Sequence, residues 1–254
     1  MKIIISPAKS IKYDPLVHNV DLTKVYFMDE AEKLVSKLQK MSSEKIAKLM
    51  HLSTDLADLN YGRYQNWETP DKHNQSNFPA IAGFNGEVYK GLDVHSMSEA
   101  QLNKTQDVVR ILSGLYGILK PLDLICPYRL EMGTKWDFSP KIKNLYHFWG
   151  DKIVTYLNNE MGKEEVLINL ASSEYFKVIP FKKLNAKVIT PHFKDFKNGQ
   201  LKIVMMYAKH QRGAMARYIV EQEISDCNDL KLYNKDGYSF DINSSTDTDW
   251  VFTR

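Results

Sequence analysis

The chain opens with Met1-Lys-Ile-Ile-Ile-Ser-Pro-Ala-Lys9, a short apolar run that ends at a serine and a proline. Consecutive isoleucines favour the extended backbone, so Lys2 to Ile5 is predicted to form a short buried strand. A serine and a lysine in the turn after a buried strand are typical of ligand contacts in α/β folds. The glycine-rich approach of a P-loop is missing, so Ser6 to Lys9 is either a ligand contact or an exposed loop.

Outward from this strand, hydrophobic periodicity predicts a mixture of helices and strands. The predicted helices cover Asp29–Lys40, Glu44–Met50, a segment after Ser53, a segment from the capping box Ser98-Glu-Ala-Gln101 to about Leu112, an apolar stripe from Leu145 to Leu157, and Arg212 to about Ser225. The predicted strands cover Val166–Leu170, Lys187–Thr190, Leu201–Ala208, Gly237–Asp241 and Asp249–Thr253, with a hairpin turn at Asn198-Gly199. The elements do not alternate strictly, which favours one compact α+β domain over residues 1–254 rather than a doubly wound fold.

The bulk composition is that of an ordinary globular protein. Of the 254 residues, 43% are hydrophobic and 26% are charged, which argues against wholesale disorder. No apolar run approaches the roughly 20 residues of a membrane-spanning helix. The first apolar run is too short for a secretion signal, and the only cysteines are Cys126 and Cys227. These features predict a cytoplasmic protein without a disulfide framework.

Charge is distributed unevenly over the last third of the chain. From Lys177 to Arg217 there are ten Lys or Arg residues and one acid, Asp195, whereas Glu221 to Asp249 contains eight acids and two lysines. A local excess of positive charge attracts phosphates by counterion release. The alternative is that these lysines only solvate strand edges and loops.

The most distinctive segment runs from Leu112 to Gly133 and reads LSGLYGILKPLDLICPYRLEMG. Gly114 and Gly117 follow a capped helix, and a glycine turn there can aim backbone N–H groups at a phosphate. The pattern is similar to a helix-hairpin-helix element, although two residues rather than one separate the glycines. Lys120 and Arg129 are candidate phosphate contacts. The alternative is a tight connection that binds no ligand.

A second basic motif, Lys209-His-Gln-Arg-Gly-Ala-Met-Ala-Arg217, is predicted to span a strand-to-helix junction. A cation near the start of a helix opposes the helix dipole, and an anion held between Arg212 and Arg217 would relieve that conflict. The competing interpretation is a solvated basic surface.

Other chemistry finds little support. Glu87, Asp123, Glu131 and Glu174 lie within distinctive motifs, but no spacing selects an acid–base pair, and Asp123 and Glu131 are expected to pair with Lys120 and Arg129. The seven histidines form no metal-binding motif, so neither a metal nor a cofactor is expected. Cys126 lies in an apolar run and is predicted to be buried and inert, and Cys227 has no basic neighbour that would lower its pKa.

Taken together, the motifs resemble the YaaA peroxide-resistance family, in order and nearly end to end. The segments that carry the resemblance are Ser6–Lys9, Gly86–Leu92, Leu112–Gly117, Lys120–Leu124, Pro127–Gly133, Phe148–Gly150, Ile168–Ala171, Glu174–Lys177, Lys183–Ala186, Lys197–Gly199, Tyr207–Lys209 and Arg212-Gly213. The resemblance implies a cytoplasmic bacterial stress protein that limits free iron and oxidative damage during exposure to hydrogen peroxide. It also implies a mixed α/β fold with a positively charged cleft and a helix-hairpin-helix-like DNA-binding element. No family motif fixes a thiol at either cysteine, so thiol-based peroxide sensing is doubtful.

Three functions remain open. The first is DNA binding without sequence preference, with tyrosines stacking on exposed bases and cations on phosphates; its candidate residues are Lys9, Gly114, Tyr116, Gly117, Lys120, Tyr128, Arg129, Lys177, Lys209, Arg212 and Arg217. The second is an enzyme that acts on a small phosphorylated or nucleotide-like substrate in a cleft lined by Lys9, Arg129, Glu131 and Arg212. The third, ranked last, is iron sequestration by the acidic segment Glu221–Asp249.

Overall fold

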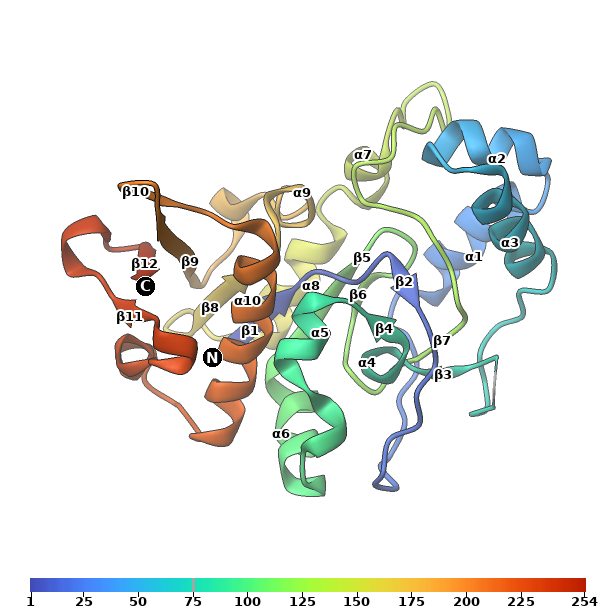
Figure 1. The fold of residues 1–254 in the computed structure, drawn as a ribbon. Helices are drawn as coiled ribbons and strands as arrows, with labels where there is room; N and C mark the ends of the chain where they lie inside the picture. Colours follow the sequence, from blue (N-terminus) through green and yellow to red (C-terminus); the bar gives the residue numbers. More distant parts are fainter. Residues whose placement is uncertain (75) are drawn as a thin grey trace.

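A computed structural model describes residues 1–74 and 76–254. Its centre is a mixed sheet with strand order β11-β12-β9-β8-β1-β5-β6, and β10 pairs with β9 (Figure 1). The strands of this sheet are β1 Lys2–Ile5, β5 Val109–Ser113, β6 Gly117–Leu119, β8 Val166–Leu170, β9 Lys187–Lys197, β10 Gln200–Lys202, β11 Ser239–Phe240 and β12 Asp249–Thr253. Two small pairs flank it, β2 Ser10–Ile11 with β4 Phe84–Asn85 and β3 Phe78–Pro79 with β7 Leu124–Ile125.

The opening isoleucine run forms the interior strand of this sheet. β1 pairs in parallel with β8 on one side and with β5 on the other, so that Ile3 lies opposite both Ile168 and Val109. β8–β9 and β9–β12 are also parallel. The three isoleucines of β1 are fully buried, as expected of a strand covered on both faces. Because these strands are parallel, their carboxyl ends meet at one edge of the sheet.

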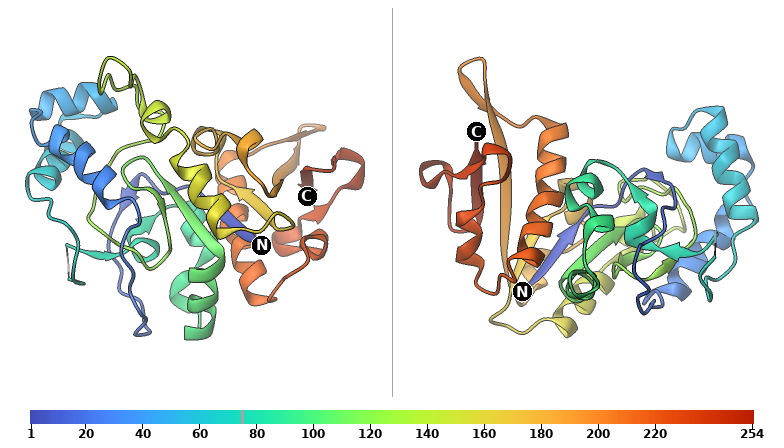
Figure 2. Two further views of the ribbon diagram at one scale, coloured as in Figure 1. Left: turned by 180° about the vertical axis from the view of Figure 1, so that it is seen from behind. Right: turned by 60° about the horizontal axis from the view of Figure 1, so that its bottom comes forward.

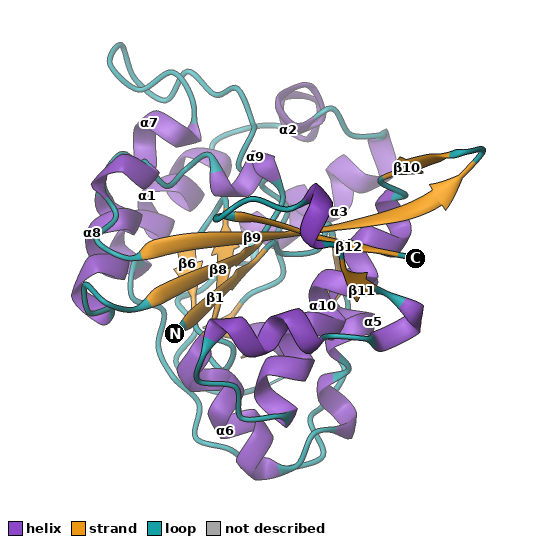
Figure 3. Ribbon diagram, turned by 90° about the vertical axis from the view of Figure 1, so that its left-hand side faces the viewer, coloured by secondary structure: helices purple, strands orange, loops and turns teal. Residues whose placement is uncertain are grey.

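Helices cover both faces of the sheet. α5 Glu87–Leu92, α6 Glu99–Val108 and α10 Met205–Glu221 pack on one face (Figure 1). The view from behind shows α1 Met28–Leu38, α7 Leu145–Trp149 and α8 Lys152–Glu160 on the other face (Figure 2), and the edge-on view separates the layers (Figure 3). The remaining helices are α2 Ser43–Met50, α3 Thr54–Gln65, α4 Ala80–Gly83 and α9 Ser173–Phe176, with short 3-10 turns at Val94–Ser96, Phe181–Lys183, Cys227–Leu232, Lys235–Gly237 and Ile242–Ser244.

α5 and α10 touch through a pair of glycines. A Cβ atom on Gly213 would lie 1.7 Å from the Val88 carbonyl oxygen, and one on Gly91 would lie 2.1 Å from that of His210. Neither backbone can move away without separating the helices, so this contact requires glycine at both positions. The Arg212-Gly213 motif is therefore explained in part by helix packing.

The expectation of one compact mixed α/β domain is confirmed. The predicted strands at Lys2–Ile5, Val166–Leu170 and Asp249–Thr253 are present with those bounds, and the Ser98 capping box is formed. The sequence did not reveal that the central strands are parallel, because the segments that connect them are long and irregular. Within residues 1–74 and 76–254, no helix combines the length and apolar character needed to cross a membrane.

Several predicted boundaries were wrong. The strand predicted as Lys187–Thr190 continues to Lys197. α6 ends at Val108, and the next five residues form β5, because β-branched residues at 109 and 111 pair with β1 instead of extending the helix. The predicted strand Leu201–Ala208 is a strand only to Lys202, and α10 begins at Met205, where good helix formers start. The stripe from Leu145 to Leu157 is two helices, interrupted at Gly150 with a positive φ of 50°.

A candidate ligand site at the carboxyl ends of the strands

Two loops and the helix α5 meet at the carboxyl-terminal edge of the sheet. The loop after β1 contains Ser6, and its hydroxyl accepts a hydrogen bond of 2.9 Å from the backbone N–H of Ser172, in the loop after β8. The Tyr89 hydroxyl of α5 donates to the Ser6 carbonyl at 3.1 Å. These bonds fix the loop that carries Lys9. In sheets with parallel strands this edge is where ligands bind.

Beside these loops lies an open cavity of about 450 Å³, which we call the edge pocket; it is lined by Lys9, Leu49, Met50, His51, Arg129, Glu131, Gly133, Thr134, Lys135 and Glu174. Three of the four residues expected to line a substrate cleft are thus brought together, namely Lys9, Arg129 and Glu131. The fourth, Arg212, does not line this cavity. Leu49 to His51, at the end of α2, were not anticipated, since no local pattern connects them to the pocket.

Charges in the edge pocket are only partly balanced. Glu131 receives both Lys9 Nζ at 2.8 Å and Arg129 Nη2 at 3.2 Å, which confirms the predicted pairing of Glu131 with Arg129. The Glu174 carboxylate accepts the backbone N–H of Gly133 at 2.9 Å. Lys135 adds a further cation, so three cations face two carboxylates. The arrangement favours an anionic ligand.

Among these charged groups, Arg129 has the least complete hydrogen bonding. Its side chain is 18% exposed, and its Nε is buried without a hydrogen-bond partner among the described residues. Its backbone is fixed, because the Tyr64 hydroxyl donates to the Arg129 carbonyl at 2.6 Å. Burial lowers the pKa of Arg63, and the positive charge of Arg129 nearby adds to that effect. A buried guanidinium donor without an acceptor is the kind of group that a bound anion would satisfy.

The glycine-rich segment after α6 does not form the expected helix-hairpin-helix element. It is a β-hairpin, in which β5 and β6 flank the turn Gly114-Leu115-Tyr116. Gly114 is needed because a Cβ atom there would lie 2.1 Å from the Leu130 carbonyl oxygen, and Gly117 has a positive φ of 73°. These two glycines therefore serve packing and turn geometry rather than phosphate binding.

The two tyrosines expected to stack on bases are buried. The Tyr116 side chain is completely inaccessible, and its hydroxyl accepts the Cys126 N–H at 3.1 Å. The Tyr128 hydroxyl bonds with the Ser113 hydroxyl at 2.6 Å. Both rings belong to the core, where no base can reach them, so this part of the prediction was wrong.

Lys120 lies at the opposite edge of the sheet from the pocket. Its Nζ is 3.5 Å from Glu160, which also receives Arg110 from the start of β5. Asp123 accepts the backbone N–H of Lys120 at 2.8 Å rather than its ammonium group, so their predicted ion pair is not formed. Lys120 therefore belongs to a structural cluster and not to the edge pocket.

The anion site expected between Arg212 and Arg217 is not supported, because both residues lie well inside α10 rather than at its start. Arg217 is fully engaged: it contacts Glu221 at 2.6 Å and the Asp93 carboxylate at 3.2 Å, and it donates to the Ser96 hydroxyl at 2.7 Å. Burial lowers the pKa of Arg212, for which no ion pair forms among the described residues. Arg217 is therefore structural, whereas Arg212 forms neither an ion pair nor a side-chain hydrogen bond with a described residue.

Lys177 and Lys209 remain available to a ligand. Lys177 directly follows α9 and lies over the Tyr146 ring, with 5.2 Å between its Nζ and the ring centroid. Lys209 is exposed in the first turns of α10. Neither forms an ion pair with a described carboxylate. α9, which ends just before Lys177, follows β8 on the same edge as Lys9, whereas α10 follows β10, which pairs antiparallel with the last residues of β9.

Neither cysteine is poised for reaction with peroxide. Burial raises the pKa of Cys126 to about 11, and its thiol donates to the Asn77 side-chain oxygen at 3.1 Å. Burial is the main cause that raises the pKa of Cys227, and the negative charge of Asp226 adds to it. The prediction that Cys126 is buried is confirmed. Across the described ranges no three His, Cys, Asp or Glu side chains gather as a metal site would require, so the acidic segment lacks the convergence that iron sequestration needs.

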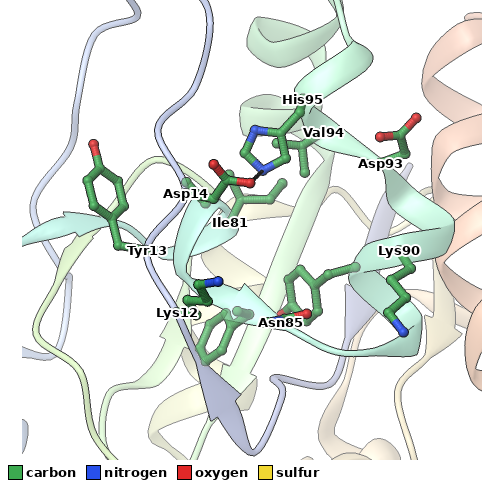
Figure 4. Close-up of a pocket in the computed structure, with 12 residues that line it drawn as sticks. Lys12, Tyr13, Asp14, Ile81, Asn85, Lys90, Asp93, Val94 and His95 are labelled. Carbon is green, nitrogen blue, oxygen red and sulfur yellow. Dashed lines mark ion pairs between the residues drawn. The ribbon is translucent and has the colours of Figure 1, made fainter.

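A second cavity, of about 470 Å³, lies between the β2–β4 pair and α5 (Figure 4). Several of its polar side chains already have partners. His95 and Asp14 approach to 3.4 Å, and Lys90 contacts Glu87, which does not line the cavity, at 2.6 Å. The Lys12 ammonium forms no ion pair with a described carboxylate. Among the described residues that line this cavity, however, no buried side-chain donor lacks a hydrogen-bond partner. The edge pocket is therefore the stronger candidate.

The fold and the edge pocket define a class of mixed α/β protein. Its site lies at the carboxyl ends of parallel strands, and the cations there are only partly neutralised by carboxylates. Comparison with known proteins identifies the family, because residues 1–244 match the family described as "Peroxide stress protein YaaA". The chain therefore belongs to the YaaA peroxide-stress family.

Curated relatives extend over the whole chain. A UPF0246 protein of Flavobacterium psychrophilum is 48% identical over 254 residues, which is 100% of both chains. UPF0246 proteins of Idiomarina loihiensis and Burkholderia lata are 45% and 47% identical over 256 and 261 residues, covering 100% of this chain and 98% of theirs. The resemblance stated from the motifs is thus confirmed.

Proposed function

We propose that this peroxide-stress protein binds DNA through the phosphate backbone, largely without sequence preference, and thereby limits iron-dependent oxidative damage. The observation that carries the proposal is the collection of cations at one edge of the sheet. Lys9 follows β1, Lys177 follows α9, and Lys209 lies near the start of α10. Contacts of lysines with phosphates carry affinity but no sequence information.

The charge balance of the last third of the chain supports this proposal. The single acid between Lys177 and Arg217, Asp195, is already bonded to Arg254 at 2.7 Å and to the Tyr238 hydroxyl at 2.8 Å. Its charge is therefore neutralised inside the protein, so that no acid within this stretch offsets the charge of its lysines. Lysines that contact phosphates displace the cations condensed on DNA. Displacing ferrous iron from phosphates would remove the metal that converts peroxide into hydroxyl radicals beside the DNA.

The test is fluorescence anisotropy with a labelled duplex across a salt series. Contacts of the three lysines with three phosphates predict that log K falls against log[salt] with a slope of about −3. Lys177→Gln and Lys209→Gln should each reduce the slope by about one. Lys163→Gln is the matched control, since Lys163 is exposed at the amino-terminal edge, just before β8. A slope near zero, or the same loss for the control, would contradict DNA binding at this edge.

A second candidate function is binding or turnover of a small phosphorylated or nucleotide-like molecule in the edge pocket. It is favoured by one observation, the buried Arg129 Nε without an acceptor in a cavity of about 450 Å³. A ligand that binds the folded chain alone raises its melting temperature in proportion to the logarithm of concentration over Kd. Phosphate, nucleoside monophosphates and nucleoside diphosphates are the probes to use. Stabilisation that persists in Arg129→Gln would contradict this second function.

A further inference from the structure

Helix α3 carries an arginine that the functions proposed above do not use. Arg63 lies in the last turn of this helix, where the helix dipole favours a cation. It is partly buried, and its one side-chain hydrogen bond to a described residue goes to the Asn60 side-chain oxygen at 3.3 Å. It forms no ion pair with a described carboxylate. Within the part of the chain that the structure describes, its positive charge is therefore not neutralised by a partner.

A buried hydrogen bond holds α3 against the wall of the edge pocket. The hydroxyl of Tyr64, the residue after Arg63, donates to the backbone carbonyl of Arg129 at 2.6 Å, and the Tyr64 side chain is completely inaccessible. Burial lowers the pKa of Arg63, and the positive charge of Arg129 lowers it further, which requires the two guanidinium groups to lie near each other. The fold therefore keeps two like charges together in a partly buried place.

Positive charge exceeds negative charge around these two arginines. The charged residues that line the edge pocket are Lys9, Arg129, Lys135, Glu131 and Glu174. Arg63 is a fourth cation beside them, so the two carboxylates leave an excess of two positive charges. Holding uncompensated charges in a partly buried place costs free energy. A ligand group with two negative charges would recover that cost.

The lining of the edge pocket also indicates what carries this anionic group. Leu49 and Met50, at the end of α2, offer apolar surface. The Glu174 carboxylate accepts the Gly133 N–H through Oε1, and Oε2 accepts no hydrogen bond from a described residue, so Oε2 can accept one from a ligand hydroxyl. A cavity of about 450 Å³ has the size of a small-molecule site. These features fit a small organic molecule that bears hydroxyl groups.

We propose that the edge pocket selects a phosphate monoester of a small hydroxylated molecule, which Arg129 contacts directly while Arg63 supplies the second positive charge. A monoester carries close to two negative charges at neutral pH, because its second pKa is about 6, whereas a diester carries one. The planar guanidinium group of Arg129 suits phosphate oxygens, and its unpaired Nε is the donor that the phosphate would use.

The two arginines have different roles in this site. Arg129 lines the cavity, whereas Arg63 does not, so Arg63 acts on the ligand through its charge rather than through a contact. The energy of that interaction is proportional to the charge of the ligand. Arg63 is therefore a specificity-determining residue that favours the dianion over the monoanion. This inference rests on the second candidate function, the binding of small phosphorylated molecules in the edge pocket.

The experiment compares adenosine 5′-monophosphate, a monoester, with adenosine 3′,5′-cyclic monophosphate, a diester. Binding to the full-length chain is measured by isothermal titration calorimetry at about pH 7.5, where the monoester is a dianion. The wild type should bind the monoester about tenfold more tightly or better. Arg63→Gln should weaken the diester about threefold and the monoester about tenfold, because doubling the ligand charge squares the factor.

Two further variants separate charge from structure. Arg63→Lys keeps the positive charge and should keep most of the preference for the monoester. Lys48→Gln is the matched control, since Lys48 is exposed on the neighbouring helix α2 and does not line the cavity. Its effect is screened by solvent and salt, so it should change the ratio of the two affinities by less than about twofold.

The possible failures are distinct. A wild type that binds both nucleotides equally would overturn the selection by charge and leave the second candidate function intact. A wild type that binds neither would overturn both. Equal losses for the two nucleotides in Arg63→Gln, or a loss in Arg63→Lys as large as in Arg63→Gln, would assign Arg63 to the fold alone. The same change of ratio in Lys48→Gln would reduce the role of Arg63 to a general positive field.

Discussion

Two arginines at opposite edges of the sheet show how a structural charge differs from a functional one. Arg110, near the start of β5, is 2% exposed, and its Nε and Nη2 donate to the Glu160 carboxylate at 2.7 and 3.0 Å. Its Nη1 donates to the carbonyls of Gln106 and Val109. Burial would raise the pKa of Glu160, but the hydrogen bonds and charge of Arg110 outweigh it and hold that pKa below its usual value.

Arg129, at the other edge, is also largely buried, but its only side-chain hydrogen bond to a described residue goes to a carboxylate that it shares with Lys9. The difference lies in the completeness of the hydrogen bonding. A buried charge such as Arg110, in which each of the three nitrogens donates a hydrogen bond, contributes to the fold and has little left to offer a ligand. A buried charge with an unused donor costs stability, and that cost is recovered only when a ligand binds.

The largest expected effect is that of Arg110→Gln. Removing one partner of a buried ion pair leaves the other charge unsatisfied, so this change should lower the unfolding free energy by about 3–5 kcal/mol in urea denaturation. The double variant Arg110→Met/Glu160→Met is the control, because it removes both charges and should recover most of the loss. A loss below about 1 kcal/mol for the single variant would contradict the structural role of Arg110.

The next largest effect is a change of stability with pH, and it arises from Asp123, which lies near Arg110 and Lys120. Burial raises the pKa of Asp123 from 3.8 to about 6, although the Thr23 hydroxyl and the Lys120 N–H partly oppose it. The folded chain then holds a proton that the unfolded chain releases between about pH 4 and pH 6. The unfolding free energy should therefore fall as pH rises through this window, by up to about 3 kcal/mol from this group. Asp123→Asn does not titrate, so its stability relative to the wild type should rise over the same window; a constant difference would exclude the raised pKa.

A smaller effect on stability is expected at the edge pocket. Arg129→Gln should change the unfolding free energy by only about 1 kcal/mol, because Lys9 still neutralises Glu131 and the unused Nε is removed. The same variant should lose the thermal stabilisation that phosphate or nucleotides give the wild type. A loss as large as that of Arg110→Gln would remove the distinction between the two arginines.

The sequence allowed β1 and β8 to be predicted, but it did not allow their neighbour β5 or the full contents of the pocket to be predicted. The isoleucines of β1 are recognisable because a run of β-branched residues has one dominant structure, and Lys9 and Arg129 were found because each lies in a distinctive motif. His51 was missed because it reaches the pocket only through the packing of α2, which no local pattern records. Tyr116 and Tyr128 were misassigned for the related reason that burial depends on the whole fold: exposed and core tyrosines look alike in a sequence.

The smallest effect on stability, and the finest test of the comparison, is that of Lys9→Gln. The Lys9 side chain is 66% exposed, so its ion pair with Glu131 should contribute less than about 0.5 kcal/mol to folding. If the pocket is built for an anion, the loss of this charge should still weaken phosphate or nucleotide binding by about tenfold, measured by the shift in melting temperature across a ligand titration. Lys135 lines the same cavity, so Lys135→Gln is the matched control for general electrostatic attraction. Equal losses for the two variants would indicate only a diffuse positive field, whereas a larger loss for Lys9→Gln would show that the turn after β1 contacts the ligand directly.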